Sequence, residues 1–548
     1  MACSAHWISC PRRLSRSLGA FSTLITGYLK FVPRYGSTMA RTYDDALAHL
    51  TLLQSNRTIT SLFPPPTPSG AAKTKDLNAL AIPEMLAWLE RAGITQQSLE
   101  SLRCIHVAGT KGKGSVCAYL TSILTQPGLS PIAGKVGTYT SPHLVSVRER
   151  IQLDGQPISQ SLFTRYFFQV WDAFTDAGRL EAERQGKVVT HDELAGPATK
   201  PFYFRFLTIL AFRVFLDERV RSAVVECGIG GEYDSTNVLP AKAVTASVVT
   251  QLGIDHVSML GGTLEEIAWH KAGIAKPERK CFTRCLKGGE GTGAMDVIRR
   301  RAGEKNAVLV ELDDDDVQVW GGVRCDSVRT VTLEGDFQKF NRALAVGASR
   351  EHLEILKDDA DTRRTSDIVH EVSEEIARGL QRAKLRGRCE TREDDGVTWL
   401  IDGAHTAESL LEVAKWYVAK SKINTNSARV LVFNQQDRDA TKLLSGFLEV
   451  VEKQAGPIFH RAIFTRNEPW GRADNEPPRD LAVQQDAADA MAAQYPSIAT
   501  YVVDNVAGAA SQVRSAASGC NGHVLVLVTG SLHLVGALLQ CLEPDVDI

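Results

Sequence analysis

The run HVAGTKGKGS, residues 106–115, has the composition of a phosphate-binding loop. Gly109 opens seven residues that include three glycines, two lysines and two hydroxyl side chains, and the candidate helix VCAYLTSIL follows. Glycines let backbone N–H groups surround phosphate oxygens, a lysine neutralises phosphate charge, and a helix N-terminus adds its dipole. The spelling differs from the common P-loop because Gly114 precedes the hydroxyl residue. We expect phosphate to bind Gly109, Thr110, Lys111, Gly112, Lys113, Gly114 and Ser115.

Three further polar groups stand where apolar runs end. Thr140 and Ser141 lie in GTYTSPHLVSVRERI, Glu226 in VECGIGGEYDSTN, and His256 in LGIDHVSML. A carboxylate at the end of a buried strand is costly unless it is paired or bound to a metal, and Mg²⁺ prefers oxygen ligands. Taken singly, each is typical of a plain turn or a structural histidine. Together, around a phosphate loop, they predict a Mg²⁺–ATP site.

The second half of the chain adds two short motifs. LRGRCE supplies Arg386 and Arg388, and arginine suits bidentate contact with phosphate or carboxylate. IDGAHT supplies Asp402 and His405 at a predicted strand end, where the aspartate would hold a ribose or orient a catalytic group. The alternative for this motif is an Asp-Gly turn followed by a helix cap.

Strands and helices alternate around these motifs, which predicts a mostly parallel α/β sheet. Strands are expected in CIHVAG, SAVVECG and AVTASVVT, and a second series in TWLIDGAHT, RVLVFN, AIFT and HVLVLVTGS. Helices are expected at 42–56, 82–93 and 201–218, and surface loops at 63–70, 288–293 and 466–480. The fold class is therefore α/β with two domains, an N-terminal P-loop NTPase-like domain (41–356) and a smaller C-terminal Rossmann-like domain (385–548). A polar linker (357–384) separates them, and the active site is expected between them.

Length and composition narrow the class of protein. The chain has 548 residues, 44% hydrophobic and 23% charged, with a formal net charge of −2. Such a near-neutral balance gives no support for nucleic-acid binding, and the most apolar run (206–216) is too short for membrane insertion. Eleven scattered cysteines without a CxxC pair indicate reduced thiols inside a cell.

The first 40 residues differ from the rest. They are rich in arginine and serine and contain no acidic residue before Asp44, which is the composition of a mitochondrial transit peptide. A disordered basic tail is the alternative. Met39 directly precedes the globular region, so a second start there would give a cytoplasmic form beside a mitochondrial one.

These motifs, in this order, resemble folylpolyglutamate synthases of the Mur ligase superfamily. The resemblance runs from about residue 42 to the C-terminus and rests on HVAGTKGKGS, TSPHLVSVRERI, ECGIGGEYDSTN, LGIDHVSMLGGTLEEIAWHKAGI, RGR, DGAHT and TGSLHLVG. It implies an ATP-dependent amide ligase that adds L-glutamate to the γ-carboxylate of a folate through an acyl phosphate. It further implies Mg²⁺, a monovalent cation as a further cofactor, and a monomer.

Site residues follow from the resemblance by matching position. Thr140, Glu226 and His256 would bind magnesium, and Lys271 matches a lysine that some members carry as a carbamate. Asn341, Arg388 and Asp402 would contact the nucleotide beside His405, and Lys113, Lys271, Asp402 and His405 form the predicted catalytic set. The chain departs from the usual family spelling at Phe337-Gln338, at Arg386-Gly387-Arg388 and at Asn434.

Three alternatives stay open at this point. A bifunctional dihydrofolate synthase would share the core motifs, and a peptidoglycan Mur ligase would share the superfamily. A P-loop switch protein that only binds nucleotide would explain the first motif, but it would leave Glu226, His256 and the second domain unexplained.

Overall fold

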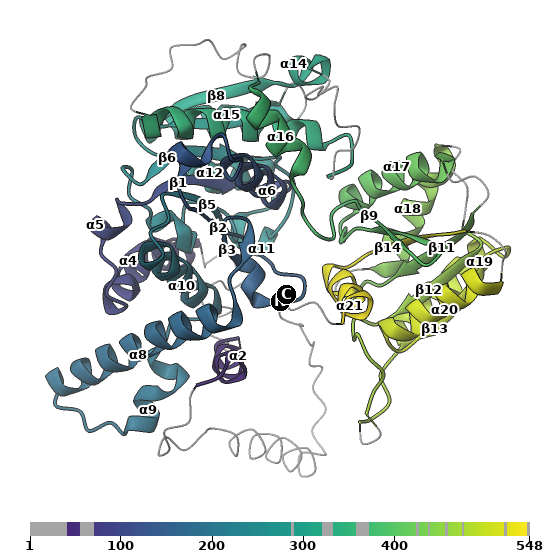
Figure 1. The fold of residues 1–548 in the computed structure, drawn as a ribbon, viewed down its shortest axis with the longest axis horizontal. Helices are drawn as coiled ribbons and strands as arrows, with labels where there is room; N and C mark the ends of the chain where they lie inside the picture. Colours follow the sequence, from purple (N-terminus) through teal and green to yellow (C-terminus); the bar gives the residue numbers. More distant parts are fainter. Residues whose placement is uncertain are drawn as a thin grey trace.

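The computed structural model describes residues 41–54, 71–286, 290–320, 333–357, 372–423, 427–436, 439–454, 459–473, 476–519 and 523–544. The predicted leader, Met39, the loop at 63–70 and residues 358–371 of the predicted linker lie outside these ranges. Two sheets, each flanked by helices, form two adjoining domains (Figure 1). The predicted two-domain α/β fold is confirmed.

The first sheet has the strand order β4-β3-β2-β5-β1-β6-β7-β8. β3 pairs antiparallel with β2 and β4, and the other pairs are parallel. Its strands are β1 (Arg103–Ala108), β2 (Val136–Tyr139), β3 (Ile151–Leu153), β4 (Gln156–Pro157), β5 (Ser222–Glu226), β6 (Val244–Val249), β7 (Lys280–Cys285) and β8 (Val308–Asp313). Because β5, β1 and β6 are parallel neighbours, the loops that follow them meet at one edge of the sheet.

Helices cover both faces of this sheet, which explains why its central strands β1, β5 and β6 are buried almost throughout. The α-helices are α2 (Tyr43–Leu52), α4 (Ala71–Arg91), α5 (Gln96–Leu99), α6 (Lys113–Leu124), α7 (Ser130–Ala133), α8 (Gln160–Arg184), α9 (His191–Ala195), α10 (Tyr203–Asp217), α11 (Val257–Leu260), α12 (Leu264–Ala272), α13 (Glu290–Glu304), α14 (Asp314–Val319), α15 (Gln338–Lys357) and α16 (Glu374–Arg382). The 3₁₀ helices are η1 (Val147–Arg150), η2 (Pro197–Thr199) and η3 (Ser235–Val238).

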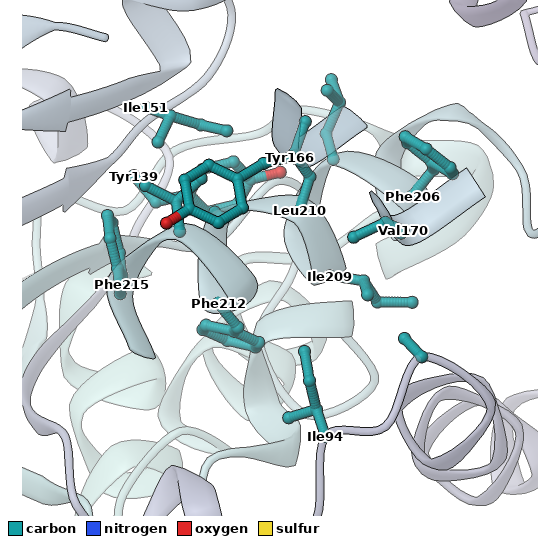
Figure 2. Packing of buried hydrophobic residues seen from close by; sticks show 14 of the residues in the cluster. Ile94, Tyr139, Ile151, Tyr166, Val170, Phe206, Ile209, Leu210, Phe212 and Phe215 are labelled. Carbon is teal, nitrogen blue, oxygen red and sulfur yellow. The ribbon is translucent and has the colours of Figure 1, made fainter. Parts of the chain in front are cut away.

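Two hydrophobic clusters lie on opposite faces of the first sheet. Cys104 of β1 belongs to the cluster under α2, α4, α8 and α10, whereas Ile105 and Val107 join the cluster under α6, α15 and α16. Figure 2 shows part of the first cluster, in which the aromatic and aliphatic side chains of α10 pack against Tyr139 and Ile151. The strands that carry the site therefore rest on a packed core on both sides.

Two local predictions differ from the structure. The helix expected at 82–93 begins earlier, at Ala71, so Pro83 lies inside α4 on its exposed side. The loop expected at 288–293 contains the first turn of α13, which begins at Glu290. Glycine suits that turn because a Cβ at Gly293 would lie 2.3 Å from the carboxylate of Glu265 on α12.

The second sheet has the order β13-β12-β11-β14-β10-β9 and is parallel except for the edge strand β9. Hydrophobic clusters fill both faces, one under α17, α18 and α19 and one under α20 and α21. The strands are β9 (Glu390–Asp394), β10 (Val397–Ile401), β11 (Ala428–Phe433), β12 (Arg461–Thr465), β13 (Ala499–Val503) and β14 (Val524–Thr529). The helices are α17 (Ala407–Ile423), α18 (Ala440–Lys453), α19 (Ala482–Gln494), α20 (Val506–Gly519) and α21 (Leu532–Leu542).

The range predicted as a linker contains α16. This helix packs on α6 of the first domain, with Ile376 and Leu380 in the core of that domain. Among the helices of the described ranges, none combines the length and apolar content that a membrane crossing requires.

Gly379→Ala should destabilise the first domain, because a Cβ at this position of α16 would lie 2.5 Å from the Cα of Ile123. We expect a loss of about 1–3 kcal/mol in the free energy of unfolding, as for overpacked cores. Gly446→Ala in α18 is the control, since nothing lies within 4 Å of its Cβ position, and it should stabilise by about 0.5–1 kcal/mol. Urea unfolding measures both changes, and equal effects would contradict the predicted close approach of α16 to α6.

Candidate functional site

The phosphate loop connects β1 to α6 in a conformation that glycine permits. Gly109 has φ +147° and Gly112 has φ +88°, a region that favours glycine. A Cβ at Gly109 would lie 1.8 Å from Oγ1 of Thr250, and one at Gly112 would lie 2.4 Å from Oδ1 of Asn341. Both glycines are therefore fixed by neighbouring side chains as well as by backbone conformation.

Residues that follow β6 hold the loop in place. The backbone N–H groups of Thr110 and Lys111 both donate to the carbonyl of Gln251, at 3.0 and 3.1 Å. The Thr110 hydroxyl donates to the carbonyl of Gly253 at 3.0 Å, and the Thr250 hydroxyl donates to the carbonyl of Lys111 at 2.7 Å. The loop is consequently preorganised by the neighbouring strand end.

Two lysines converge on one carbonyl oxygen of the loop. Lys113 Nζ donates to the Gly109 oxygen at 3.0 Å, and Lys271 Nζ of α12 donates to the same oxygen at 2.8 Å. Lys271 is 3% exposed, and burial together with the charge of Lys113 lowers its pKa to about 7. A bound phosphate would relieve this concentration of positive charge.

Glu226 places a buried carboxylate beside the loop. It ends β5, pairs in register with Val107 of β1, and is 3% exposed. Burial raises the pKa of Glu226 to about 6, although Lys113, the Ser141 N–H at 3.2 Å and two arginines favour its ionised form. A buried carboxylate that faces a cationic loop fits the donor chemistry of a hard divalent cation.

The other two predicted metal ligands lie on separate loops. Thr140 follows β2, next to β5, and its backbone N–H donates to the carbonyl of Arg150 at 3.0 Å. His256 lies at φ +50° before α11, with its imidazole 3.8 Å from the carboxylate of Asp255. Within the described ranges, no group of three or more His, Cys, Asp or Glu side chains forms a metal-binding cluster. Mg²⁺ needs no such cage, because it usually retains waters and binds substrate phosphates.

Asp402 orders the turn that carries the other candidates of the second domain. One carboxylate oxygen accepts the Cys389 N–H and the other accepts the Ala404 N–H, both at 2.8 Å. Burial raises the pKa of Asp402, opposed by Arg388. His405 follows in the same turn, with Nδ1 3.0 Å from the Gly403 carbonyl.

The two domains contribute to one site. The Arg388 guanidinium is among the charges that lower the pKa of Glu226 across the domain boundary. Lys111 pairs with Glu408 of α17 at 2.9 Å. Arg386, by contrast, pairs at 2.7 Å with Glu543, which directly follows α21.

Asn341 reaches the loop from α15. Its side-chain amide donates to Gln338 at 2.9 Å, and Gln338 donates to the hydroxyl of Ser115 at 3.3 Å. The sequence alone assigned no site role to Gln338, Thr250 or Glu408, although each lies near a predicted feature. Gln338 belongs to a departure from the family spelling, Thr250 ends the predicted strand AVTASVVT, and Glu408 closely follows IDGAHT.

Glu226→Gln should stabilise the nucleotide-free protein at neutral pH. The folded-state pKa of about 6, against 4.5 for the free group, means that the folded chain holds this proton more tightly than the unfolded chain. The free energy of unfolding therefore falls as pH rises from below 4.5 to above about 6. The total loss is roughly 2 kcal/mol. Thermal unfolding without Mg²⁺ should show a gain for Glu226→Gln above about pH 7 that disappears below about pH 4.5.

Glu311→Gln is the control of opposite sign. Hydrogen bonds from Arg299 lower the pKa of Glu311, so removing that charge should destabilise the protein at neutral pH. If Glu226→Gln destabilises the protein above about pH 7, the ionised carboxylate of Glu226 does not lower the stability of the folded state as proposed.

Comparison with known proteins identifies the family. A family model described as dihydrofolate synthetase, C-terminal domain, matches residues 382–541. A folylpolyglutamate synthase of Neurospora crassa is 37% identical over 544 residues, which cover 95% of each chain. A probable folylpolyglutamate synthase of Schizosaccharomyces pombe is 37% identical over 531 residues, covering 92% of this chain and 95% of the relative.

Solved structures share the fold. Mycobacterium tuberculosis folylpolyglutamate synthase complexed with ADP and AMPPCP matches with a TM-score of 0.59 and 23% identity, over 84% of this chain and 94% of that chain. E. coli FolC in complex with DHPP and ADP matches with a TM-score of 0.60 and 23% identity, over 92% and 98%. Since the identity to curated relatives extends over nearly the whole length, the chain belongs to the folylpolyglutamate synthase family.

Proposed function

We propose that this chain is an ATP-dependent ligase that joins L-glutamate to the γ-carboxylate of a folate. Family membership supports the reaction class. The observation that carries the chemistry is the pair of lysines on the Gly109 carbonyl, beside the buried Glu226. This arrangement suits a triphosphate whose terminal phosphoryl group is transferred.

The reaction has two steps. A γ-carboxylate oxygen of the folate attacks the γ-phosphorus of ATP, an O–P bond forms, and ADP leaves. The amine of glutamate then attacks the carbonyl carbon of the acyl phosphate, an amide forms, and phosphate departs with the carboxylate oxygen. Lys113 and the N–H groups of the first turn of α6 bind the phosphates and stabilise charge on the transferring group.

Residues of the second domain complete the nucleotide site in this proposal. Arg388 supplies a cation whose charge acts on Glu226. From the first domain, Asn341 of α15 reaches the loop at Gly112. Asp402 acts by holding the turn of Arg388 and His405, because both of its oxygens already accept backbone N–H groups. His405, which the resemblance places beside the nucleotide contacts, is with Asp402 a member of the predicted catalytic set.

Thr140, Glu226 and His256 would hold magnesium, and the buried carboxylate of Glu226 fits such a role. Bound Mg²⁺ would neutralise charge on the phosphate oxygens. Lys271 fits the proposed carbamate, because a pKa of about 7 leaves much of its amine uncharged and able to react with CO₂ near neutral pH. We assign no residues to the monovalent cation, and we expect a monomer.

A bifunctional enzyme that also uses dihydropteroate is the alternative, and the family model over 382–541 is described as a dihydrofolate synthetase domain. The full-length relatives carry the name folylpolyglutamate synthase, which supports polyglutamylation as the main activity. Mass analysis after incubation with ATP, glutamate and either tetrahydrofolate or dihydropteroate distinguishes the two. Product from tetrahydrofolate alone is expected.

Lys113→Ala should reduce ligation on the order of 10³-fold, as for the loss of one preorganised charge at a transition state. Lys135→Ala is the control, because this lysine pairs with Glu218 away from the loop and should leave turnover near the wild-type rate. Initial rates of ADP release in the presence of folate and glutamate measure both. Near-normal turnover of Lys113→Ala would remove the loop from the mechanism.

We further propose that translation starts at both Met1 and Met39. The long form would enter mitochondria and the short form would stay in the cytoplasm. Helix α2 supports a functional short form, because its N-cap is Thr42 and its capping partner is Asp45, both downstream of Met39. Added γ-glutamates give a folate extra negative charge that hinders its escape through membranes. One-carbon chemistry in each compartment would therefore need its own enzyme pool.

Met39→Leu should abolish the cytoplasmic pool and leave the mitochondrial pool in place. Removal of residues 1–38 should have the reverse effect and retain ligase activity. Cell fractionation with an antibody against the C-terminal domain measures both pools. An undiminished cytoplasmic pool in Met39→Leu cells would rule out the second start.

A further inference from the structure

Glu334, which lies just before α15, joins the two domains through α17. One carboxylate oxygen accepts the indole N–H of Trp416 at 2.7 Å, and the other accepts Lys420 Nζ at 2.7 Å. Trp416 and Lys420 are four residues apart and so lie on one face of α17. A single carboxylate of the first domain thus binds two donors of the second domain.

The residues around Glu334 bridge the same boundary. Leu333 is buried in the core of the first domain, whereas Phe337 packs against the core of the second domain under α17. Gly335 lies between them at φ +97°, which lets the chain reverse direction over this short distance. The segment 333–337 is therefore anchored in both cores.

Helix α17 makes its other polar contact with the first domain near its N-terminus. Glu408 pairs there with Lys111 of the phosphate loop. At 1.5 Å per residue, this point lies about 12–18 Å along the helix from Trp416 and Lys420. Two points so far apart fix the direction of α17 relative to the loop.

The two contacts differ in strength. The Glu408 side chain is 64% exposed, and such a surface pair contributes little. The Glu334 side chain is 29% exposed and accepts two hydrogen bonds, one of them from the ammonium group of Lys420. Hydrogen bonds that involve a charged donor are stronger than neutral ones. Lys111 can therefore exchange Glu408 for a phosphate while the Glu334 contact keeps α17 in place.

Glu334 also lies close to the turn that carries Arg388. After burial and Asp402, its charge is among the groups that raise the pKa of the Cys389 thiol. Cys389 directly follows Arg388 and donates its N–H to Asp402. On the other side, Phe337 precedes Gln338, which contacts Ser115.

We propose that Glu334 is a positioning residue that latches α17, through Trp416 and Lys420, so that Arg388 and His405 face the phosphate loop. The proposal rests on the proposed function only for the reaction in which Arg388 and His405 take part. The latch itself governs nucleotide binding, which can be measured without folate or glutamate.

The test compares Glu334→Ala with Glu311→Ala. Glu311 is a matched control, because its side chain is 25% exposed and accepts two hydrogen bonds from Arg299 within the first domain. Calorimetry with ADP should give a Kd about tenfold higher for Glu334→Ala and little change for Glu311→Ala, in line with the loss of charged hydrogen bonds. Trp416→Phe and Lys420→Met should each reproduce part of the increase.

A double-mutant cycle separates positioning from general destabilisation. In the background of Arg388→Ala, Glu334→Ala should raise the Kd by less than about threefold, because both changes remove the same contact with the nucleotide. Hydrogen exchange of residues 403–409 should accelerate in Glu334→Ala and not in Glu311→Ala. Equal Kd values for these two variants, or fully multiplicative effects of Glu334→Ala and Arg388→Ala, would overturn the proposal.

Failure of the proposed function gives a different result. If wild-type protein binds ADP but adds no glutamate to folate, the ligase assignment is wrong. The comparison of Kd values still tests whether Glu334 positions α17 for nucleotide binding.

Discussion

The carbonyl oxygen of Gly109 accepts hydrogen bonds from the ammonium groups of Lys113 and Lys271. When both side chains are protonated, two cations meet one partial negative charge. Burial, and after it the charge of Lys113, lowers the pKa of Lys271 to about 7. The arrangement is tolerable because the loop is held rigidly by Gln251, Gly253 and Thr250. A site prepared in this way suits a polyanion, since its charge offsets the repulsion between neighbouring ammonium groups.

The strand order explains how this loop meets its partners. β1 lies between β5 and β6, so Glu226 and the loop after β6 reach the phosphate loop from either side. The second domain closes the site from a third side, through Arg388 and Glu408. Leu144 adds an apolar contact, since its side chain packs against the hydrophobic cluster under α20 and α21. Its backbone also comes close to α21, because a Cβ at Gly536 would lie 2.2 Å from the backbone oxygen of Leu144. Only a residue without a side chain permits such close docking.

The sequence predicted the parts of the site that depend on local spacing. Gly109, Glu226 and Asp402 stand at the ends of apolar runs, and these runs form β1, β5 and β10. Lys113 follows in the same loop motif, at the start of α6. The pattern did not predict the strands β2, β3, β4, β7, β8, β9 and β13, most of which are short or half polar. Nor did it predict that both oxygens of Asp402 bind backbone N–H groups, because Cys389 lies on a different segment. Contacts such as Glu334 with Trp416 join residues 82 positions apart and carry no local signature.

The central claim is that the folate carboxylate is activated by phosphorylation before glutamate attacks. The most direct measurement uses tetrahydrofolate labelled with ¹⁸O in both oxygens of its terminal γ-carboxylate, incubated with the protein, ATP, Mg²⁺ and glutamate. An acyl phosphate requires that the phosphate released in each turnover carries one ¹⁸O atom and that the new amide keeps the other. Glutamylated product accompanied by unlabelled phosphate would contradict the account.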